Sequence, residues 1–358
     1  MKNIQTKLTI VITSFNRYPY LLRLLKFLLS YGTPYKILIL DSSSDIISDK
    51  NLQKILTNER IKLCKYEPNI PVNDKKSIGI KLVETDYFVF CGDDDFVIPS
   101  SLNECIEFLD KRLDYSAAEG LFFSHGSYEI SQKNGFNLNL LTPFNNKYRE
   151  VEDTFQRIKN YFTYSSHYAN MAVLRSRLMQ IVYSDSNLVK NNLGNNAFIY
   201  ETIITCILLI HGKIKTFPSF FSSYESHIKF KSLYQIISPK EVYSDKAMKV
   251  TIDLITQHLT EYEKISVSDA ESFANEKIEE LFCKSKTRSI QKSQITNLHS
   301  MRLLKRIRHN LGIRRRVKAL FNNLLYQGCH PSIYPEYLDD FKKVREAVIS
   351  AGLSNDEL

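Results

Sequence analysis

The first third of the chain alternates short apolar runs with stretches of helical periodicity. Residues 7–15, "KLTIVITSF", are rich in β-branched side chains and predict a buried strand. The following stretch, "YPYLLRLLKFLLSYG", has helical apolar spacing, with Pro19 near its start and Gly32 at its end. Further strands are predicted at "YKILILD", "IKLCKYE" and "DYFVFC", and further helices at 49–58, 73–84 and 99–113. Strands that alternate with helices predict an α/β fold, a mostly parallel sheet flanked by helices.

Beyond residue 114 the pattern changes twice. Up to about residue 230 it mixes a strand at "GLFFSHGSYEI" with helices at 151–161 and at "NAFIYETIITCILLIHGKI". From about residue 232 the strand signals vanish and amphipathic helical segments continue. We therefore expect an α/β domain over 1–231 and a helical C-terminal region over 232–358.

Polar residues follow three of the predicted strands. Thr13, Ser14 and Asn16 come at the end of the first strand, Asp41 ends the second, and an aspartate run, 93–95, follows the fourth. In open α/β sheets, ligands bind outside the carboxyl ends of the strands. We expect these side chains to face one edge of the sheet and to form one site.

The aspartate run, in the sequence "CGDDDFVIP", suggests a metal ion. Three adjacent carboxylates repel one another unless a cation lies among them. Mg²⁺ and Mn²⁺ prefer oxygen ligands, and they usually bind one or two carboxylates together with substrate phosphates. Such a metal neutralises charge on a departing phosphate, so the run indicates diphosphate chemistry. The alternative is a solvated acidic turn that caps the helix beginning at Pro99.

Composition and cysteine placement indicate a folded protein with a large core and no disulfide framework. With 358 residues and 43% hydrophobic content, the chain can bury a substantial core. The apolar run "CILLI" at 206–210 is too short to span a bilayer. The N-terminal apolar run is followed by no small-residue cleavage site, so it reads as a strand and not as a signal peptide. The scattered cysteines, with no CxxC pair, predict a reduced cytoplasmic protein without a cysteine metal site.

The net charge of +9 is unevenly distributed. The segment 302–318, "RLLKRIRHNLGIRRRVK", holds eight Lys or Arg and no acid. Such a segment attracts nucleic acid, anionic lipid or phosphorylated substrates. Its interspersed Leu and Ile residues would also suit an amphipathic helix on an anionic membrane, or a helix that packs on the core.

The ordered segments "TSFNR", "LILDSSSD", "NDKKSIGIKLVETDYFVF" and "GDDDF" resemble the family 2 nucleotide-sugar glycosyltransferases. The resemblance covers roughly 7–230 and is strongest over 7–110. It implies the glycosyltransferase A fold, with 1–231 as the catalytic domain that binds the nucleotide-sugar. It also implies an inverting transfer that depends on Mn²⁺ or Mg²⁺.

The resemblance assigns roles around the donor. It implies that Thr13, Ser14 and Asn16 border the nucleotide and that Asp41 contacts the base or ribose. Lys76 stands where a basic residue approaches the diphosphate; otherwise it is a solvated helix lysine.

The aspartates match the DxD region of the family, with Asp94 or Asp95 on the metal and Asp93 and Asp94 near the donor. Gly92 stands at the first position of the common form Asp-x-Asp-Asp, so the resemblance does not fix which of the three aspartates binds the metal and which the donor. Some enzymes of this fold supply a further metal or diphosphate contact after the last core strand, where this chain has His227.

The resemblance also implies a catalytic base. In the family this residue lies at the start of a later helix, about eleven residues before a glycine, which here is Gly212. That position is Glu201, with glutamate in place of the more usual aspartate. An inverting transfer needs one carboxylate to take a proton from the attacking hydroxyl. The other interpretation of Glu201 is a solvated residue at a helix start.

The predicted function is therefore transfer of a sugar from a nucleoside diphosphate to a hydroxyl of a glycan or lipid-linked acceptor, in surface polysaccharide synthesis. The predicted location is the cytoplasm, with peripheral contact at the inner face of the membrane. One alternative is a nucleotidyltransferase of similar fold, although "ITSFNRYPY" lacks the glycines of a phosphate loop. Another is a non-catalytic polyanion-binding protein that acts through 302–318.

Overall fold

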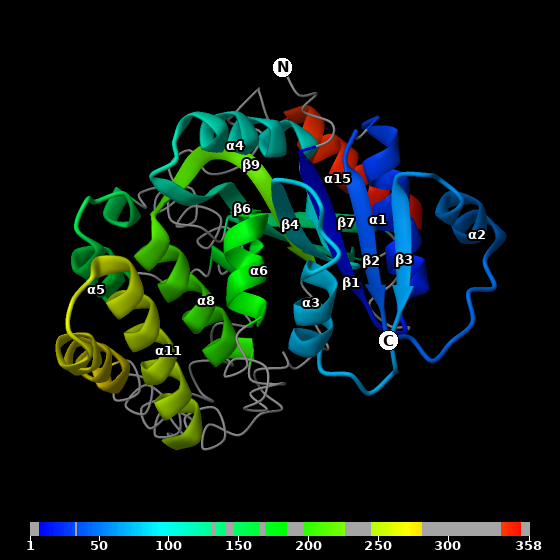
Figure 1. Ribbon diagram of the computed structural model, residues 1–358. Coiled ribbons are helices and arrows are strands. Elements are labelled where there is room, and N and C mark those ends of the chain that lie inside the picture. The colour runs from blue at the N-terminus through cyan, green and yellow to red at the C-terminus, as the bar shows by residue number, and fades with distance from the viewer. Residues whose placement is uncertain are drawn as a thin grey trace, which may run out of the picture.

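A twisted mixed sheet forms the centre of the protein, with helices on both of its faces (Figure 1). The computed structural model describes residues 7–32, 34–130, 133–140, 147–164, 169–184, 197–225, 245–280 and 338–351. Two of the predicted contacts lie outside these ranges: His227 and the basic segment 302–318.

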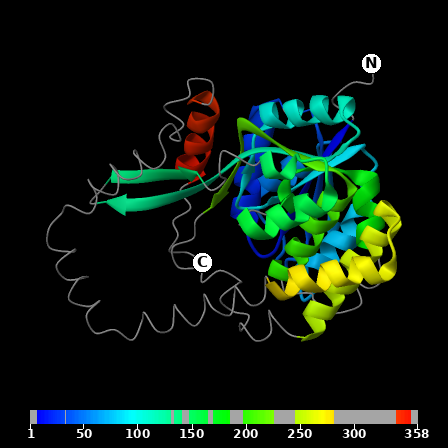
Figure 2. The same ribbon diagram turned by 90° about the vertical axis from the view of Figure 1, so that its left-hand side faces the viewer.

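The sheet has nine strands in the order β3-β2-β1-β4-β8-β6-β9-β5, and β7 pairs with β6. The strands are β1 (Leu8–Ser14), β2 (Lys36–Asp41), β3 (Ile61–Lys65), β4 (Tyr87–Gly92), β5 (Phe96–Val97), β6 (Tyr115–Ile130), β7 (Lys133–Leu140), β8 (Val173–Arg175) and β9 (Lys213–Glu225). The first four are parallel, as the βαβ pattern predicted. The short β8 runs antiparallel between β4 and β6, so the second half of the sheet is mixed. Beyond this sheet, the β6–β7 ribbon projects away from the body (Figure 2).

Helices cover the two faces as separate layers. One layer contains α1 (Tyr18–Ser30), α2 (Lys50–Leu56), α4 (Pro99–Lys111) and α15 (Leu338–Ala351). The other contains α3 (Val72–Ile80), α5 (Thr154–Tyr164), α6 (Ser176–Ser184), α8 (Ala197–His211) and α11 (Asp245–Glu263). Successive residues of a strand point to opposite faces. Ile10 and Ile12 of β1 therefore pack in the α1 layer, and Val11 packs in the α8 layer. Burial on both faces explains the unbroken apolar runs of these strands.

The ends of the helices follow the local signals in the sequence. Proline stands in the first turn of both α1 and α4, where its missing N–H costs no hydrogen bond. The side chain of Asp49 caps α2 by accepting from the backbone N–H groups of Asn51 and Leu52. These helices begin where the sequence predicted.

Elements from the C-terminal part of the chain pack on both faces of the sheet. On one face α11 packs against α8, and on the other α15 packs against α1. Val344 and Val348 of α15 are buried, and Asp340 accepts a 2.6 Å hydrogen bond from the hydroxyl of Tyr31. Within the described ranges, none of the helices has the length and hydropathy that a membrane span requires.

Candidate functional site

The register of the parallel strands brings their polar ends to one edge of the sheet. Ser14 pairs with Asp41 across β1 and β2, and Thr13 pairs with Gly92 across β1 and β4. The turn after β4, which holds Asp93, therefore lies beside the end of β1. The structure brings these predicted site residues together by backbone pairing alone.

Asp93 is the buried member of the aspartate turn. Its side chain is fully buried, and its Oδ2 accepts a 2.8 Å hydrogen bond from Ser14 Oγ. Its Oδ1 forms a 2.7 Å ion pair with the guanidinium of Arg17. Burial raises the pKa of Asp93 to about 7, and the charge of Arg17 opposes that rise.

Arg17 also pairs with Asp94, at 2.5 Å between Nη1 and Oδ2. The preceding residue, Asn16, has a φ of +53°, a left-handed conformation that asparagine adopts more readily than most residues. The backbone N–H of Asn16 donates to Ser43 Oγ at 2.7 Å, and its Oδ1 accepts from the backbone N–H of Ser44 at 3.0 Å. These bonds fix the loop after β1 to the loop after β2 and leave Arg17 over the aspartate turn.

The carboxylates of Asp94 and Asp95 converge over Gly92. A Cβ atom at residue 92 would lie 2.8 Å from Asp94 Oδ1 and 2.7 Å from Asp95 Oδ2, closer than real Cβ contacts come. Glycine at this position therefore leaves room for both carboxylates. Burial raises the pKa of Asp95 well above its ordinary value, and the charge of Asp94 adds to that rise.

Asp41 is buried and surrounded by donors. It accepts hydrogen bonds from the backbone N–H and hydroxyl of Ser43 and from the hydroxyl of Tyr18, and it pairs with Lys65 at 2.7 Å. Burial alone would raise the pKa of Asp41, but the bonds from Lys65, Ser43 and Tyr18 together lower it. Asp41 is thus a fixed, charged group at the end of β2.

Two adjacent lysines of α3 point to different parts of the molecule. Lys75 Nζ donates to the carbonyl oxygen of Ser14 at 2.8 Å and to Ser42 Oγ at 2.7 Å. Burial lowers the pKa of Lys75 to about 8. Lys76 Nζ instead lies 4.9 Å from the centre of the Phe90 ring, where burial lowers its pKa and the charge of Glu201 opposes the shift. Lys75, which the sequence analysis did not single out, is the lysine at the strand ends.

A buried ion pair supports the aspartate turn from behind. Arg23 of α1 donates to the carbonyl oxygen of Asp94 at 2.7 Å and pairs with Glu225 of β9 at 2.5 Å. His125 Nε2 lies 3.6 Å from the same carboxylate, and its Nδ1 is 2.8 Å from Ser223 Oγ. No role was predicted for Arg23 from the sequence, although an arginine on the apolar side of a helix is a signal that it is buried and paired.

Glu201 lies in the α8 layer of the structure. Its Oε1 accepts a 3.2 Å hydrogen bond from Asn170 Nδ2. The neighbouring Tyr200 hydroxyl lies 3.1 Å from Ser77 Oγ, which ties the first turns of α8 to α3. The predicted base therefore lies on the side of α3 that also carries Lys76. The predicted metal contact His227 is outside the described residues.

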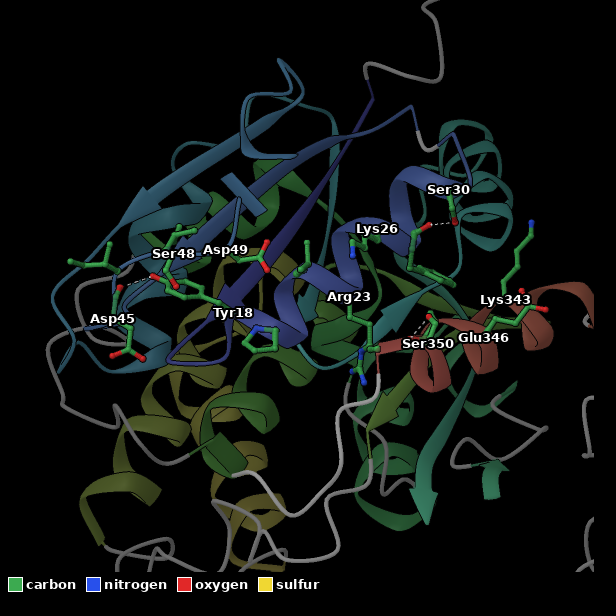
Figure 3. Close-up of a pocket in the computed structure, with 17 residues that line it drawn as sticks. Tyr18, Arg23, Lys26, Ser30, Asp45, Ser48, Asp49, Lys343, Glu346 and Ser350 are labelled. Atoms are coloured by element: carbon green, nitrogen blue, oxygen red, sulfur yellow. Dashed lines mark hydrogen bonds between the residues drawn. The ribbon is translucent and has the colours of Figure 1, made fainter. Parts of the chain in front are cut away.

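A cavity of about 880 Å³ adjoins this edge on the outer side of α1 (Figure 3). The residue range 45–49, the helix α1 and the helix α15 form its walls. Tyr18 and Arg23 line the cavity, and they also contact Asp41 and Asp94. The cavity therefore borders the strand-end site without containing its carboxylates.

The donor set over Gly92 fits a hard divalent cation. Asp94 and Asp95 supply carboxylate oxygens that already converge, and Arg17 shows that a positive charge is stable beside them. In the part of the chain that the structure describes, no three His, Cys, Asp or Glu side chains gather as a metal site. A cation held by these two aspartates would complete its coordination with water and substrate phosphate, the usual arrangement for Mg²⁺.

Comparison with known proteins gives a family match in the first half of the chain. Residues 9–174 match the family model described as Glycosyl transferase family 2. Among solved structures, the chain is similar to S. aureus TarS 1-349, at 14% sequence identity and a TM-score of 0.49, over 78% of this chain and 73% of that one. The TarS 1-349 complexes with UDP-GlcNAc and with UDP give the same identity and TM-score, over 77% and 78% of this chain and 73% of those chains. No curated protein matches the chain significantly.

The family match runs from β1 into β8 and contains the whole strand-end cluster of Ser14, Asp41 and the aspartate turn. Residues 9–174, a little under half of the chain, are similar to a family 2 glycosyltransferase domain, and this match supports a glycosyltransferase.

Proposed function

We propose that the protein transfers a sugar from a nucleoside diphosphate sugar to an acceptor hydroxyl, with inversion, and that a divalent cation at Asp94 and Asp95 is required. One observation carries this proposal: the two carboxylates converge over Gly92 at the same sheet edge as Ser14 and Asp41. The site therefore offers separate groups for the nucleoside and for a cation-bound diphosphate.

The donor would lie across the ends of β1, β2 and β4. Asp41 would lie on the side of the nucleoside, where its fixed carboxylate would accept hydrogen bonds from ribose or base. Lys75 and Arg17 provide positive charge between Asp41 and the aspartate turn, where the diphosphate would lie. The bound cation would neutralise charge that develops on the departing diphosphate. Thr13, Ser14 and Asn16 would shape the loop that borders the nucleotide, and Lys76 would place its positive charge beside Glu201 and not beside the diphosphate.

The transfer itself needs a base for the acceptor. The acceptor oxygen attacks the anomeric carbon while the bond from that carbon to the diphosphate oxygen breaks, and the nucleoside diphosphate leaves with the bonding electrons. The proton of the acceptor hydroxyl goes to a carboxylate, and we assign that role to Glu201. Asn170 orients the Glu201 carboxylate through the 3.2 Å bond, and the charge of Lys76 attracts it.

The wider setting of the reaction follows from the sequence. We propose a glycan or lipid-linked acceptor in surface polysaccharide synthesis, handled at the cytoplasmic face of a membrane. The basic segment 302–318 would bind anionic headgroups there, as part of a C-terminal region over 232–358 that follows the catalytic domain 1–231. His227 would add a contact to the metal or diphosphate.

A donor screen tests the proposed activity. The full chain is heated with UDP, GDP, dTDP or CDP, or with their sugars, in the presence of Mn²⁺ or Mg²⁺, and its unfolding temperature is recorded. We expect one nucleoside diphosphate and its sugars to stabilise the protein, and the same sugar nucleotide to release that diphosphate slowly. Absence of stabilisation by every diphosphate, or release of pyrophosphate from nucleoside triphosphates, would contradict the proposal.

A further inference from the structure

The Arg17 guanidinium lies beside the position that a cation would take. Its guanidinium reaches Asp93 Oδ1 at 2.7 Å and Asp94 Oδ2 at 2.5 Å. The planar fork of arginine suits two carboxylates, because its donors diverge in a fixed geometry. The Arg17 side chain is 28% exposed, whereas that of Asp93 is fully buried. The guanidinium can therefore leave the aspartates toward the open site, and Asp93 cannot follow it.

The two carboxylate oxygens of Asp94 have different neighbours. Its Oδ2 accepts from Arg17, while its Oδ1 lies over Gly92 beside Asp95 Oδ2. A divalent cation over Gly92 and the guanidinium of Arg17 would thus lie on the two oxygens of one carboxylate. Two positive groups at this separation repel each other, and burial strengthens the repulsion because the local dielectric is low.

The backbone keeps Arg17 in reach of the aspartates without fixing its side chain. Asn16, in the left-handed region, is held by Ser43 and Ser44. Arg17 itself precedes the first residue of α1 and makes no cap hydrogen bond to that helix through its side chain. Its side chain is therefore anchored by the two aspartates, and a diphosphate beside Lys75 would offer it a second anionic partner.

We propose that Arg17 is a displaceable internal cation: it neutralises Asp93 and Asp94 in the donor-free enzyme, weakens cation binding there, and moves to the diphosphate when cation and donor bind together. This inference rests on the proposed function. It makes the binding of cation and donor cooperative. The diphosphate draws Arg17 away from Asp94, which favours the cation, and the cation displaces Arg17 from Asp94, which favours its contact with the diphosphate. The metal-free site is protected from mutual repulsion of its aspartates, and the cation enters with the nucleotide.

The test measures Mn²⁺ binding alone, with no nucleotide, by the electron paramagnetic resonance signal of free Mn²⁺. Arg17→Gln removes the charge and should bind Mn²⁺ about tenfold or more tightly than the unaltered chain, since a neighbouring charge typically changes an ionic equilibrium by one to three powers of ten. Arg17→Lys keeps the charge but loses the fork, and should give an intermediate affinity. If Arg17→Gln does not fold, the Arg17→Lys comparison carries the same test.

Lys65→Gln is the matched control. It also removes one positive charge at the strand ends, but Lys65 pairs with Asp41 and not with the aspartate turn. We expect its Mn²⁺ affinity to stay near that of the unaltered chain. An equal gain in both variants, or no gain in folded Arg17→Gln and Arg17→Lys, would overturn the proposal.

A second arm tests the cooperativity. With Mn²⁺ saturating, the Arg17→Gln protein should bind the nucleoside diphosphate from the donor screen more weakly than the unaltered chain, so that Mn²⁺ and nucleotide strengthen each other less. A cooperativity equal to that of the unaltered chain would contradict the movement of Arg17. If no nucleoside diphosphate binds any form, the donor proposal fails, while the Mn²⁺ arm still decides whether Arg17 competes with the cation.

Discussion

The backbone N–H of Glu225, the last residue of β9, donates a 3.0 Å hydrogen bond to Oδ1 of Asp95 in the turn after β4. The carboxylate of the same glutamate pairs with Arg23, which in turn holds the carbonyl oxygen of Asp94. The aspartate turn is therefore held from the far half of the sheet and from α1 at once. A strand more than a hundred residues later in the chain therefore holds the turn that carries Asp94 and Asp95.

The Arg23–Glu225 pair should contribute strongly to stability. Both side chains are buried, at 2% and 0% exposure, so removal of either leaves an uncompensated charge in the core. We expect Glu225→Gln to lower the free energy of unfolding by about 3–5 kcal/mol, measured by urea denaturation. The exposed pair Lys36–Glu84 is the control, and Glu84→Gln should cost less than about 1 kcal/mol. Equal losses of unfolding free energy in Glu225→Gln and Glu84→Gln would show that the buried pair stabilises the fold no more than the exposed pair does.

Gly92 should be required for function more than for folding. The Cβ of Gly92→Ala would meet only the ends of two short side chains, Asp94 Oδ1 and Asp95 Oδ2, so these carboxylates can move aside. Their displacement should weaken Mn²⁺-dependent nucleotide binding by about tenfold to a hundredfold, because small misplacements of reacting groups are costly. Thermal unfolding should stay close to that of the unaltered protein. Normal Mn²⁺-dependent affinity in Gly92→Ala would exclude a cation over this residue.

The lowered pKa of Lys75 predicts how donor binding depends on pH. Burial lowers its pKa from 10.5 to about 8, so in the donor-free enzyme it is charged below pH 8 and neutral above. A diphosphate attracts the charged form. Affinity should therefore fall as the pH rises above about 8, and binding should take up a proton there.

Calorimetry in two buffers of different ionisation enthalpy measures that proton. In Lys75→Arg the charge persists at all these pH values, so the fall in affinity and the proton uptake should both disappear. A pH dependence that survives in Lys75→Arg would assign the titration to another group.

Glu201→Gln tests the base. Glutamine keeps the shape and can still bond Asn170 Nδ2 through its amide oxygen, but it cannot take the proton of the acceptor. Turnover should drop by about a hundred- to ten-thousand-fold, the usual contribution of general-base catalysis, while donor affinity stays nearly unchanged. Loss of donor binding would point to a structural role, and near-normal turnover would remove Glu201 from the mechanism.

The first half of the sheet was predictable from sequence because each of its strands is buried on both faces. β1, β2 and β4 are continuous apolar runs, and the intervening helices have clear periods and proline starts. The second half was harder. β6 pairs in parallel with β9, about a hundred residues later, through several register shifts. No local pattern specifies such a long-range, irregular pairing.

The candidate site was likewise predictable only in part. Ser14, Asp41 and the aspartates stand at strand ends, so the topology alone brings them to one edge. Lys75 and Lys76 could not be told apart, because adjacent helix residues point about 100° apart and only the docking of α3 decides which one faces the strand ends. Arg17 gave no signal either, since its position over Asp93 and Asp94 depends on the left-handed turn at Asn16.

Calorimetric titration of the nucleoside diphosphate chosen by the donor screen, in EDTA and then in Mn²⁺, tests the central claim most directly. We predict weak or no binding in EDTA, restored by Mn²⁺, and loss of that restoration in Asp95→Asn. Asp253→Asn, an exposed aspartate of α11, should behave like the unaltered protein. Equal affinity in EDTA and Mn²⁺, or full Mn²⁺-dependent binding by Asp95→Asn, would contradict a cation-dependent donor site at the aspartate turn.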